Sequence, residues 1–300
     1  MQKTHLGLIG YGEVGGIFCA GLAPQVESAR AWDLKLADPG TAEPLRDRAA
    51  HDGVTLCASA ADLCAASNLV ISAVTASNTV AVAREAAAHL QPGTVFLDLN
   101  SASPGAKRAA AALIEAAGGH YVEAGVMTSV PPYGIRVPML LGGAHADALA
   151  RRLAAFGMDV KVVSSDLGVA SAIKMCRSVM IKGLEALVIE SYTAARAYGV
   201  EDYVLPTLQE TFPSIDWSEQ GRYFYSRVVQ HGRRRAEEMR EVANTVREAG
   251  FEPWMAAATA EKQDWVARQA AQGVFEGVQA ADSWQAYADR LIAAGRQNAS

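Results

Sequence analysis

The chain has 300 residues, of which 50% are hydrophobic and 20% are charged, and its formal net charge at pH 7 is −5. The negative net charge argues against a general nucleic-acid-binding protein, and the composition is that of an ordinary globular protein. A chain of this length is long for a single hydrophobic core, so we expect two domains.

Metal, secretion and membrane signals are missing from the sequence. The six histidines show no metal-ligand spacing, and the four cysteines form no C-x-x-C pair or zinc motif: Cys19, Cys57, Cys64 and Cys176. A strand-like segment begins at His5 with no secretory pattern before it, and no apolar run is long enough to span a bilayer. We therefore expect a cytoplasmic protein with reduced thiols, a small-molecule substrate, and no nucleic-acid or membrane partner.

The N-terminal half alternates strand-like and helix-like segments. Strands are expected over 5–9, 33–38, 54–57, 68–74, 94–98, 119–123, 137–142 and 159–163. Helices are expected over 13–22, 42–50, 59–65, 76–90, 104–117 and 145–156. This alternation predicts an α/β fold, with a doubly wound parallel sheet in a first domain that covers residues 1–165.

The first loop carries the glycine pattern of a dinucleotide-binding site. Residues 10–15 read Gly-Tyr-Gly-Glu-Val-Gly, which is G-x-G-x-x-G between a strand-like and a helix-like segment. Gly10 allows the tight turn, Gly12 lets backbone N–H groups approach a pyrophosphate, and Gly15 lets the helix pack close to the strand. The N–H groups at the helix N-terminus favour phosphates. The alternative is a glycine-rich turn without a ligand.

An acidic residue, Asp38, ends the strand expected over 33–38. It follows the glycine loop by about 20–28 residues, where an acid binds both adenine-ribose hydroxyls of NAD and repels the 2′-phosphate of NADP. The alternative is an aspartate that starts the turn at Pro39-Gly40. Together with the glycine loop, Asp38 predicts NAD, with NADP as the weaker alternative.

A polar segment, Asp98 to Pro104, follows the strand expected over 94–98. Ser103 and Pro104 fit a helix cap and the first helical position. Asn100 and Ser101 are expected at the carboxyl edge of the sheet, which faces the ligand crevice in doubly wound folds. Taken singly, both residues also fit plain turn chemistry.

The pattern changes near Asp166. Residues 167–198 are largely apolar and predict one long helix, which would be buried in a core or in a subunit interface. Further helices are expected over 201–210, 217–249, 253–272 and 282–296, and no strand pattern returns. We therefore predict an all-helical second domain over residues 166–300, for substrate binding and dimerisation.

Two charged features lie in this second half. Lys174 falls within the apolar helix, where it either snorkels to the surface, forms a salt bridge or faces a cleft as a catalytic base. Residues 231–241 combine one histidine with four arginines and three glutamates. Such mixed charges indicate a solvated helix face or, alternatively, a site that grips a carboxylate or phosphate.

Together these landmarks resemble the β-hydroxyacid dehydrogenase family, which includes 3-hydroxyisobutyrate dehydrogenase and, more distantly, 6-phosphogluconate dehydrogenase. The resemblance covers nearly the whole chain. It rests on the cofactor loop, on Asp98–Pro104 as the D-x-S-T-x-S-P segment, on Glu123–Val126 as the start of the substrate loop, and on Gly168–Met175 as the segment with the catalytic lysine. The helical half, particularly His231 to Met239, resembles a less-studied branch with a divergent C-terminal domain.

The resemblance implies roles for individual residues. Lys174 becomes the expected general acid/base, and Ser101 is expected to orient the substrate. Contacts to the cofactor are expected from the loop and from two neighbouring strand ends: Gly10, Tyr11, Gly12, Glu13, Val14, Gly15, Asp38, Val74 and Asn100.

The chain departs from the family where the substrate binds. The family's substrate loop usually reads Ser-Gly-Gly, whereas this chain has Thr128 and Ser129 after a methionine. After the lysine the family usually carries asparagine, whereas this chain has Arg177 and Ser178. An arginine holds a carboxylate or phosphate in a way that asparagine cannot. We expect these four residues to bind an acid substrate different from that of the better-known members.

The expected function is oxidation or reduction at the hydroxyl-bearing carbon of a hydroxy acid or sugar acid, with NAD as the hydride carrier. Imine reduction and oxidative decarboxylation of a sugar acid on the same fold are alternatives, although the retained lysine argues against the first. A dinucleotide-binding protein without catalysis is a third possibility. The apolar helix predicts a homodimer.

Overall fold

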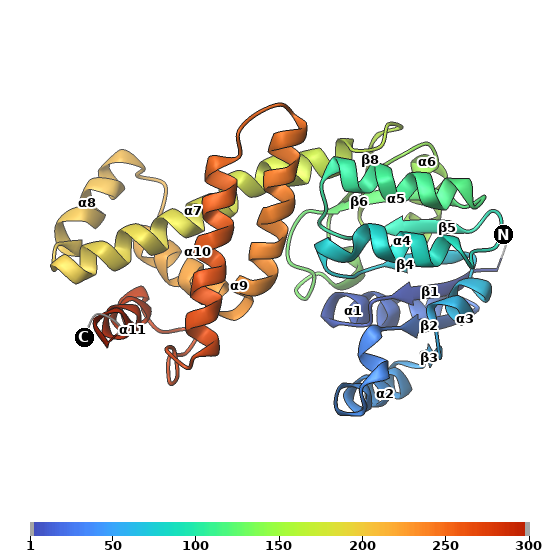
Figure 1. Cartoon of the computed structure of the whole chain (residues 1–300), viewed down its shortest axis with the longest axis horizontal. Coiled ribbons are helices and arrows are strands. Elements are labelled where there is room, and N and C mark those ends of the chain that lie inside the picture. The colour runs from blue at the N-terminus through green and yellow to red at the C-terminus, as the bar shows by residue number, and fades with distance from the viewer. Residues whose placement is uncertain (1–2, 298–300) are drawn as a thin grey trace. The chain divides into compact units, whose positions relative to one another are not determined.

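The computed structural model describes residues 3–297 (Figure 1). The chain divides into two compact units, Met1–Cys176 and Arg177–Ser300. The first unit thus extends past residue 165, where we placed the domain boundary, and includes the first turns of helix α7 (Val169–Tyr198).

The first unit is built on an eight-stranded sheet with the order β3-β2-β1-β4-β5-β6-β7-β8. The first six strands are parallel, in the 3-2-1-4-5-6 order of dinucleotide-binding sheets, whereas β7 is antiparallel to β6 and parallel to β8. The strands are β1 (His5–Ile9), β2 (Ser28–Trp32), β3 (Thr55–Leu56), β4 (Leu69–Ser72), β5 (Val95–Asp98), β6 (His120–Val126), β7 (Met139–Gly142) and β8 (Val160–Ser164). The doubly wound sheet predicted from the alternating segments is confirmed.

Helices cover both faces of this sheet. They are α1 (Glu13–Leu22), α2 (Pro39–Asp52), α3 (Ala60–Ala65), α4 (Thr79–Ala87), α5 (Pro104–Ala116) and α6 (Ala146–Ala155). Successive strand residues point to opposite faces, so Ile71 packs in a cluster with α1 and α6, while Val70 packs in a second cluster with α4 and α5. Burial on both faces explains why Leu69–Ile71 of β4 and Val95–Leu97 of β5 are all apolar.

The strand expected over 33–38 is wrong. The second strand is Ser28–Trp32, and a 3-10 turn, Leu34–Ala37, follows it with Leu34 69% exposed. The buried side chains of β2 are only Ala29 and Ala31, which give a weak strand signal, whereas the leucines at 34 and 36 imitate an alternating strand. The acid that directly follows β2 is therefore Asp33, and Asp38 instead caps α2.

The second unit consists of the rest of α7 with α8 (Glu201–Thr211), α9 (Trp217–Glu248), α10 (Trp254–Ala271) and α11 (Trp284–Gln297). Its core is aromatic, with Tyr192, Tyr225 and Trp284 fully or almost fully buried. Between β8 and residue 297 the structure contains no further strand, which confirms the helical second half. Of the helices within residues 3–297, none is long and apolar enough to cross a membrane.

Candidate functional site

The glycine loop after β1 has the geometry that its sequence predicts. Gly10 has a φ of +92°, and a Cβ there would lie 2.5 Å from the Ala73 carbonyl oxygen. A Cβ on Gly15 would lie 1.9 Å from the Gly10 oxygen, so only glycine fits. Gly12 caps α1, and a Cβ there would meet nothing within 4 Å. The space at the α1 N-terminus is therefore open and edged by backbone donors, which fits a pyrophosphate.

Tyr11 is held in place by two residues of α2, Arg48 and Asp52. Its ring is fully buried, and the Arg48 guanidinium carbon lies 4.5 Å from the ring centroid while donating a hydrogen bond to the Tyr11 carbonyl. The Tyr11 hydroxyl donates to Asp52 at 3.3 Å, and burial, aided by nearby Cys19 and Asp52, raises the pKa of Tyr11 to about 12. Only the backbone of Tyr11 is thus available to a cofactor. The role of Arg48 depends on how α2 packs, so no sequence motif marks it.

A pocket of about 470 Å³ lies along α1 and α2 beside the loop. Its lining contains Gly12, Glu13, Lys35 and Arg48. Asp33 follows β2 and accepts the backbone N–H of Lys35, one of these lining residues, at 2.9 Å. The carboxylate of Asp38 accepts the Gly40 N–H at 3.0 Å and serves as the cap of α2.

Val14 faces inward and packs against the hydrophobic core, although it belongs to the predicted cofactor motif. At the neighbouring strand ends the structure brings together three predicted residues. A Cβ on Gly10 would lie 2.8 Å from Val74, and the Val74 N–H donates to Asn100 Oδ1 at 2.7 Å. Asn100 also donates to Ser72 Oγ at 3.0 Å and is almost fully buried. Its side chain therefore braces β4 against β5.

A buried ion pair between Asp98 and Lys107 supports the carboxyl edge of the parallel strands. Asp98 Oδ1 lies 2.9 Å from Lys107 Nζ and accepts the Asn100 N–H at 2.8 Å. Asp98 Oδ2 accepts the Tyr121 hydroxyl at 2.6 Å. Burial, followed by the charge of Asp98, raises the pKa of Tyr121 well above its ordinary value. Neither Lys107 nor Tyr121 was identified from the sequence, although a lysine in the first turn of α5 next to an Asp98 motif was a usable signal.

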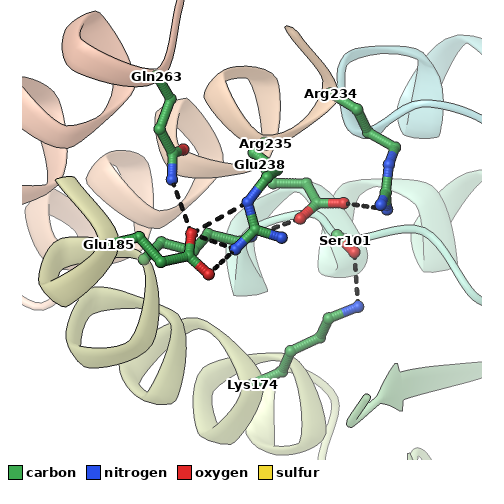
Figure 2. A network of polar contacts seen from close by, with 8 residues as sticks. Ser101, Lys174, Glu185, Arg234, Arg235, Glu238 and Gln263 are labelled. Atoms are coloured by element: carbon green, nitrogen blue, oxygen red, sulfur yellow. Dashed lines mark hydrogen bonds and ion pairs between the residues drawn. The ribbon is translucent and has the colours of Figure 1, made fainter. Parts of the chain in front are cut away.

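Lys174 and Ser101 form the contact on which a catalytic site could be built (Figure 2). Lys174 Nζ donates to Ser101 Oγ at 2.5 Å, from the second turn of α7 to the loop after β5. Lys174 is partly buried, and the face of β6 at Gly125 lies against its Cβ. Lysine and hydroxyl thus meet at the carboxyl edge of the parallel strands, as expected for a doubly wound sheet.

The other predicted substrate residues lie in two segments of the chain. Thr128 is exposed and Ser129 is partly buried, and both lie in the connection between β6 and β7. Arg177, which is exposed, and Ser178, which is buried, belong to the second unit. Their roles remain predictions.

The charged stretch of α9 is a structural network within the second unit (Figure 2). Arg235 forms a buried, two-pronged ion pair with Glu185, and Gln263 donates to the same carboxylate at 3.2 Å. Glu238 pairs with Lys182 and accepts from Arg234 at 3.0 Å. Arg233, Arg234 and Arg240 are exposed, as expected of a solvated helix face, whereas Arg235 and Glu238 form ion pairs with α7. The anion-binding alternative stays a prediction. Among the described residues no group of three or more His, Cys, Asp or Glu side chains could hold a metal ion.

Residues 5–158 match the model of the NAD binding domain of 6-phosphogluconate dehydrogenase. The chain belongs to this family. Residues 195–266 match a second model, a domain of unknown function, DUF1932. The family assignment agrees with the sheet order, the glycine loop and the helical second half, and it confirms the resemblance noted from the sequence.

Solved structures share this architecture over nearly their whole length. A conserved hypothetical protein from Sinorhizobium meliloti is 38% identical, with 97% of each chain covered and a TM-score of 0.75. The conserved protein MTH1747, described as structurally similar to 3-hydroxyacid dehydrogenases, is 32% identical, with 89% of this chain and 98% of that chain covered and a TM-score of 0.67. A 3-hydroxyisobutyrate dehydrogenase from Mycobacterium tuberculosis, with L-serine, is 18% identical, with 97% and 99% covered and a TM-score of 0.70, which shows the shared fold.

Proposed function

We propose that the chain is a dehydrogenase that transfers a hydride between NAD and the hydroxyl-bearing carbon of a hydroxy acid or sugar acid. The observation that supports it best is the contact between Lys174 and Ser101, because it joins a titratable base and a hydroxyl at the edge where the cofactor loop also ends. The family membership and the open space at the N-terminus of α1 support the binding of a dinucleotide.

Lys174 acts as the general base. In oxidation, its neutral amine takes the proton of the substrate hydroxyl, and in reduction its ammonium returns that proton to the developing alkoxide. When bound, NAD supplies the acceptor for the hydride that leaves the same carbon. Ser101 holds the substrate oxygen near Lys174 Nζ, since the two side chains already share a hydrogen bond. The acid group of the substrate pairs with Arg177, with Ser178, Thr128 and Ser129 as further hydrogen-bonding groups.

The preference for NAD is assigned to Asp33 in place of Asp38. Asp33 directly follows β2, where an acid accepts the ribose hydroxyls and repels a 2′-phosphate. Lys35 and Arg48 line the adjoining pocket and provide positive charge for the phosphates. Replacing Asp33 with serine is expected to weaken NADH binding and to strengthen NADPH binding, both measured by fluorescence titration. Tighter binding of NADPH by the unmodified protein would contradict the assignment.

The experiment for the reaction compares the protein with its Lys174→Met variant over a panel of hydroxy acids and sugar acids. Loss of the base is expected to lower kcat by about 10²–10⁴-fold, while the Kd for NADH changes little. If turnover survives within a few-fold, the role of Lys174 is wrong. Release of carbon dioxide during turnover would instead identify an oxidative decarboxylase, and reduction of imines would identify the second alternative. NADH binding without turnover on the whole panel would favour a non-catalytic protein.

We further propose that the protein forms a homodimer through α7. Met180 and Leu187 are seven residues apart and therefore lie on one face of this helix, where they expose 73% and 53% of their surface, and Ile181 beside them exposes 42%. A second copy of the same helix offers a matching apolar surface. Light scattering is expected to give twice the chain mass, and Leu187→Glu is expected to shift it to the monomer. The control is Leu34→Glu, an exposed leucine of the first unit. A monomer at micromolar concentration of the unmodified protein would contradict the dimer.

A further inference from the structure

The first turn of α7 is capped by a side chain from the sheet. Gly168 precedes the helix and has no side chain of its own to serve as a cap. Glu123, on β6, accepts the Gly168 N–H at 2.8 Å and the Ala170 N–H at 3.0 Å through Oε1. The Ser171 hydroxyl donates to Glu123 Oε2 at 2.8 Å. Glu123 is fully buried, so its carboxylate accepts two N–H groups of the first turn away from water and complements the positive end of the helix.

Two glycines make room for this arrangement. Gly142, paired with Glu123 across β6 and β7, would place a Cβ 2.6 Å from Glu123 Oε1. Gly125, on the same face of β6 as Glu123, would place a Cβ 3.0 Å from the Ala170 carbonyl oxygen and 3.5 Å from Lys174 Cβ. Strand β6 therefore contacts α7 from its first turn as far as the lysine.

The geometry points to Glu123 as the positioning residue of Lys174. Its carboxylate fixes the start of α7 and thereby the position along the helix axis at which Lys174 Nζ meets Ser101. The lysine lies less than two turns beyond the cap, about 9 Å along the helix axis, so a shift of the first turn carries it directly. The inference rests on the proposed catalytic role of Lys174. Displacing a catalytic group by about 1 Å can cost about 10²-fold in rate, so Glu123 affects turnover without touching the substrate.

The first test separates positioning from mere stability. Glu123→Ala is expected to lower kcat by about 10–100-fold with an unchanged Kd for NADH, because the glycine loop is untouched. Glu123→Gln keeps an oxygen that accepts the two backbone N–H groups and is expected to restore most of the rate. In a Lys174→Met background, Glu123→Ala is expected to have no further effect on residual turnover. An equal loss in both backgrounds would overturn the inference.

A steric variant tests the same displacement with every charge intact. Gly125→Ala pushes on the α7 backbone beside Lys174 and is expected to lower kcat at least about tenfold by the same misplacement. The matched control is Gly183→Ala on the same helix, where a Cβ would meet only Thr259 Oγ1 at 3.9 Å. It is expected to leave kcat unchanged. Equal activity of the two variants would count against the positioning role of β6.

Two further readouts do not need turnover. Amide hydrogen exchange over residues 168–174, and the rate at which acetic anhydride labels Lys174, are both expected to rise in Glu123→Ala and to stay near the original values in Glu123→Gln. If they rise while the unmodified protein turns over no substrate, the positioning holds and the proposed function fails. If neither changes in Glu123→Ala, the positioning is wrong whatever the reaction. Where Glu123→Ala does not fold, Gly125→Ala carries the same comparison.

Discussion

Tyr121 donates its hydroxyl to Asp98 at 2.6 Å, directly beneath the loop that carries Asn100 and Ser101. The same carboxylate pairs with Lys107, and all three side chains are almost completely buried. A buried anion with a cation, a hydroxyl and a backbone N–H around it is fully compensated. The pair of Asp98 with Lys107 and the hydroxyl of Tyr121 therefore support this loop, although none of the three is itself one of the proposed substrate-binding residues.

Removing the charge of Asp98 is expected to destabilise the first unit strongly. In Asp98→Asn the buried ammonium of Lys107 loses its anion, and breaking such a pair costs about 3–5 kcal/mol. The double variant Asp98→Asn/Lys107→Met removes the unpaired charge and is expected to recover part of the loss. Urea unfolding measures both. A cost below about 1 kcal/mol for the single variant would show that the pair contributes no more than a surface salt bridge.

The ion pair of Arg235 with Glu185 is expected to behave likewise in the second unit. Arg235→Met leaves a carboxylate that is only 2% exposed without its cation, at a cost of about 3–5 kcal/mol. Arg234→Ala on the same helix removes a half-exposed partner of Glu238 and is expected to cost less than about 1 kcal/mol. Equal losses in the two variants would argue against a difference between buried and exposed pairs here.

Two glycines of the cofactor loop give a matched contrast. Gly12→Ala adds a Cβ into open space at a permitted φ of −74°, so the fold is expected to persist. The same methyl group obstructs a pyrophosphate, and NADH binding is expected to weaken at least about tenfold. Gly15→Ala drives a Cβ into the Gly10 carbonyl and is expected to lower the melting temperature as well. Titration calorimetry with NADH and thermal unfolding of both variants separate the effect on binding from the effect on folding. An unaltered NADH affinity in Gly12→Ala would mean that the phosphates bind elsewhere.

The stability of the first unit is expected to depend on His145 at mildly acidic pH. Burial, followed by the neighbouring His120, lowers the pKa of His145 from 6.5, while Glu115 opposes this weakly. The rings of the two histidines lie 4.0 Å apart. Because the folded state favours the neutral imidazole, its contribution is present above pH 6.5 and is lost as the pH falls below it. Melting temperatures between pH 7.5 and 5 are expected to fall less in His145→Gln than in the unmodified protein. The exposed His89 is the control, and an identical slope in His145→Gln would contradict the prediction.

The parts of the fold that were predictable are those with strong local signals. Alternating apolar segments gave the order of strands and helices, and the glycine spacing located the loop correctly because backbone sterics alone demand glycine at Gly10 and Gly15. The second strand was predicted wrongly because its buried residues are alanines. They are buried by their neighbours on β1 and β3, and alanine itself has little preference for strands. The same error led us to expect the ribose acid at Asp38, whereas the observed end of β2 is the reason for which we propose Asp33.

The supporting residues of the candidate site could not be inferred in the same way. Lys174 and Ser101 were predicted, and the structure places them in contact. Glu123 and Tyr121 act on partners 45 and 23 residues away and look like ordinary core positions in the sequence, whereas Lys107, nine residues from Asp98, was a signal that we did not use. Their function depends on which strand lies beside which helix, and that information is tertiary.

The first turn of helix α7 is hydrogen-bonded to strand β6 by Glu123, which lies 45 residues before Gly168 in the sequence. From there the helix continues without interruption into the second unit. The border between the two units, after Cys176, thus falls within this helix. A chimaera that joined the first 165 residues of this chain to the remainder of a relative would pair one parent's strand with the other parent's helix start. Exchanges between family members should therefore take β6 and the opening turns of α7 from the same parent, with the crossover placed beyond the lysine.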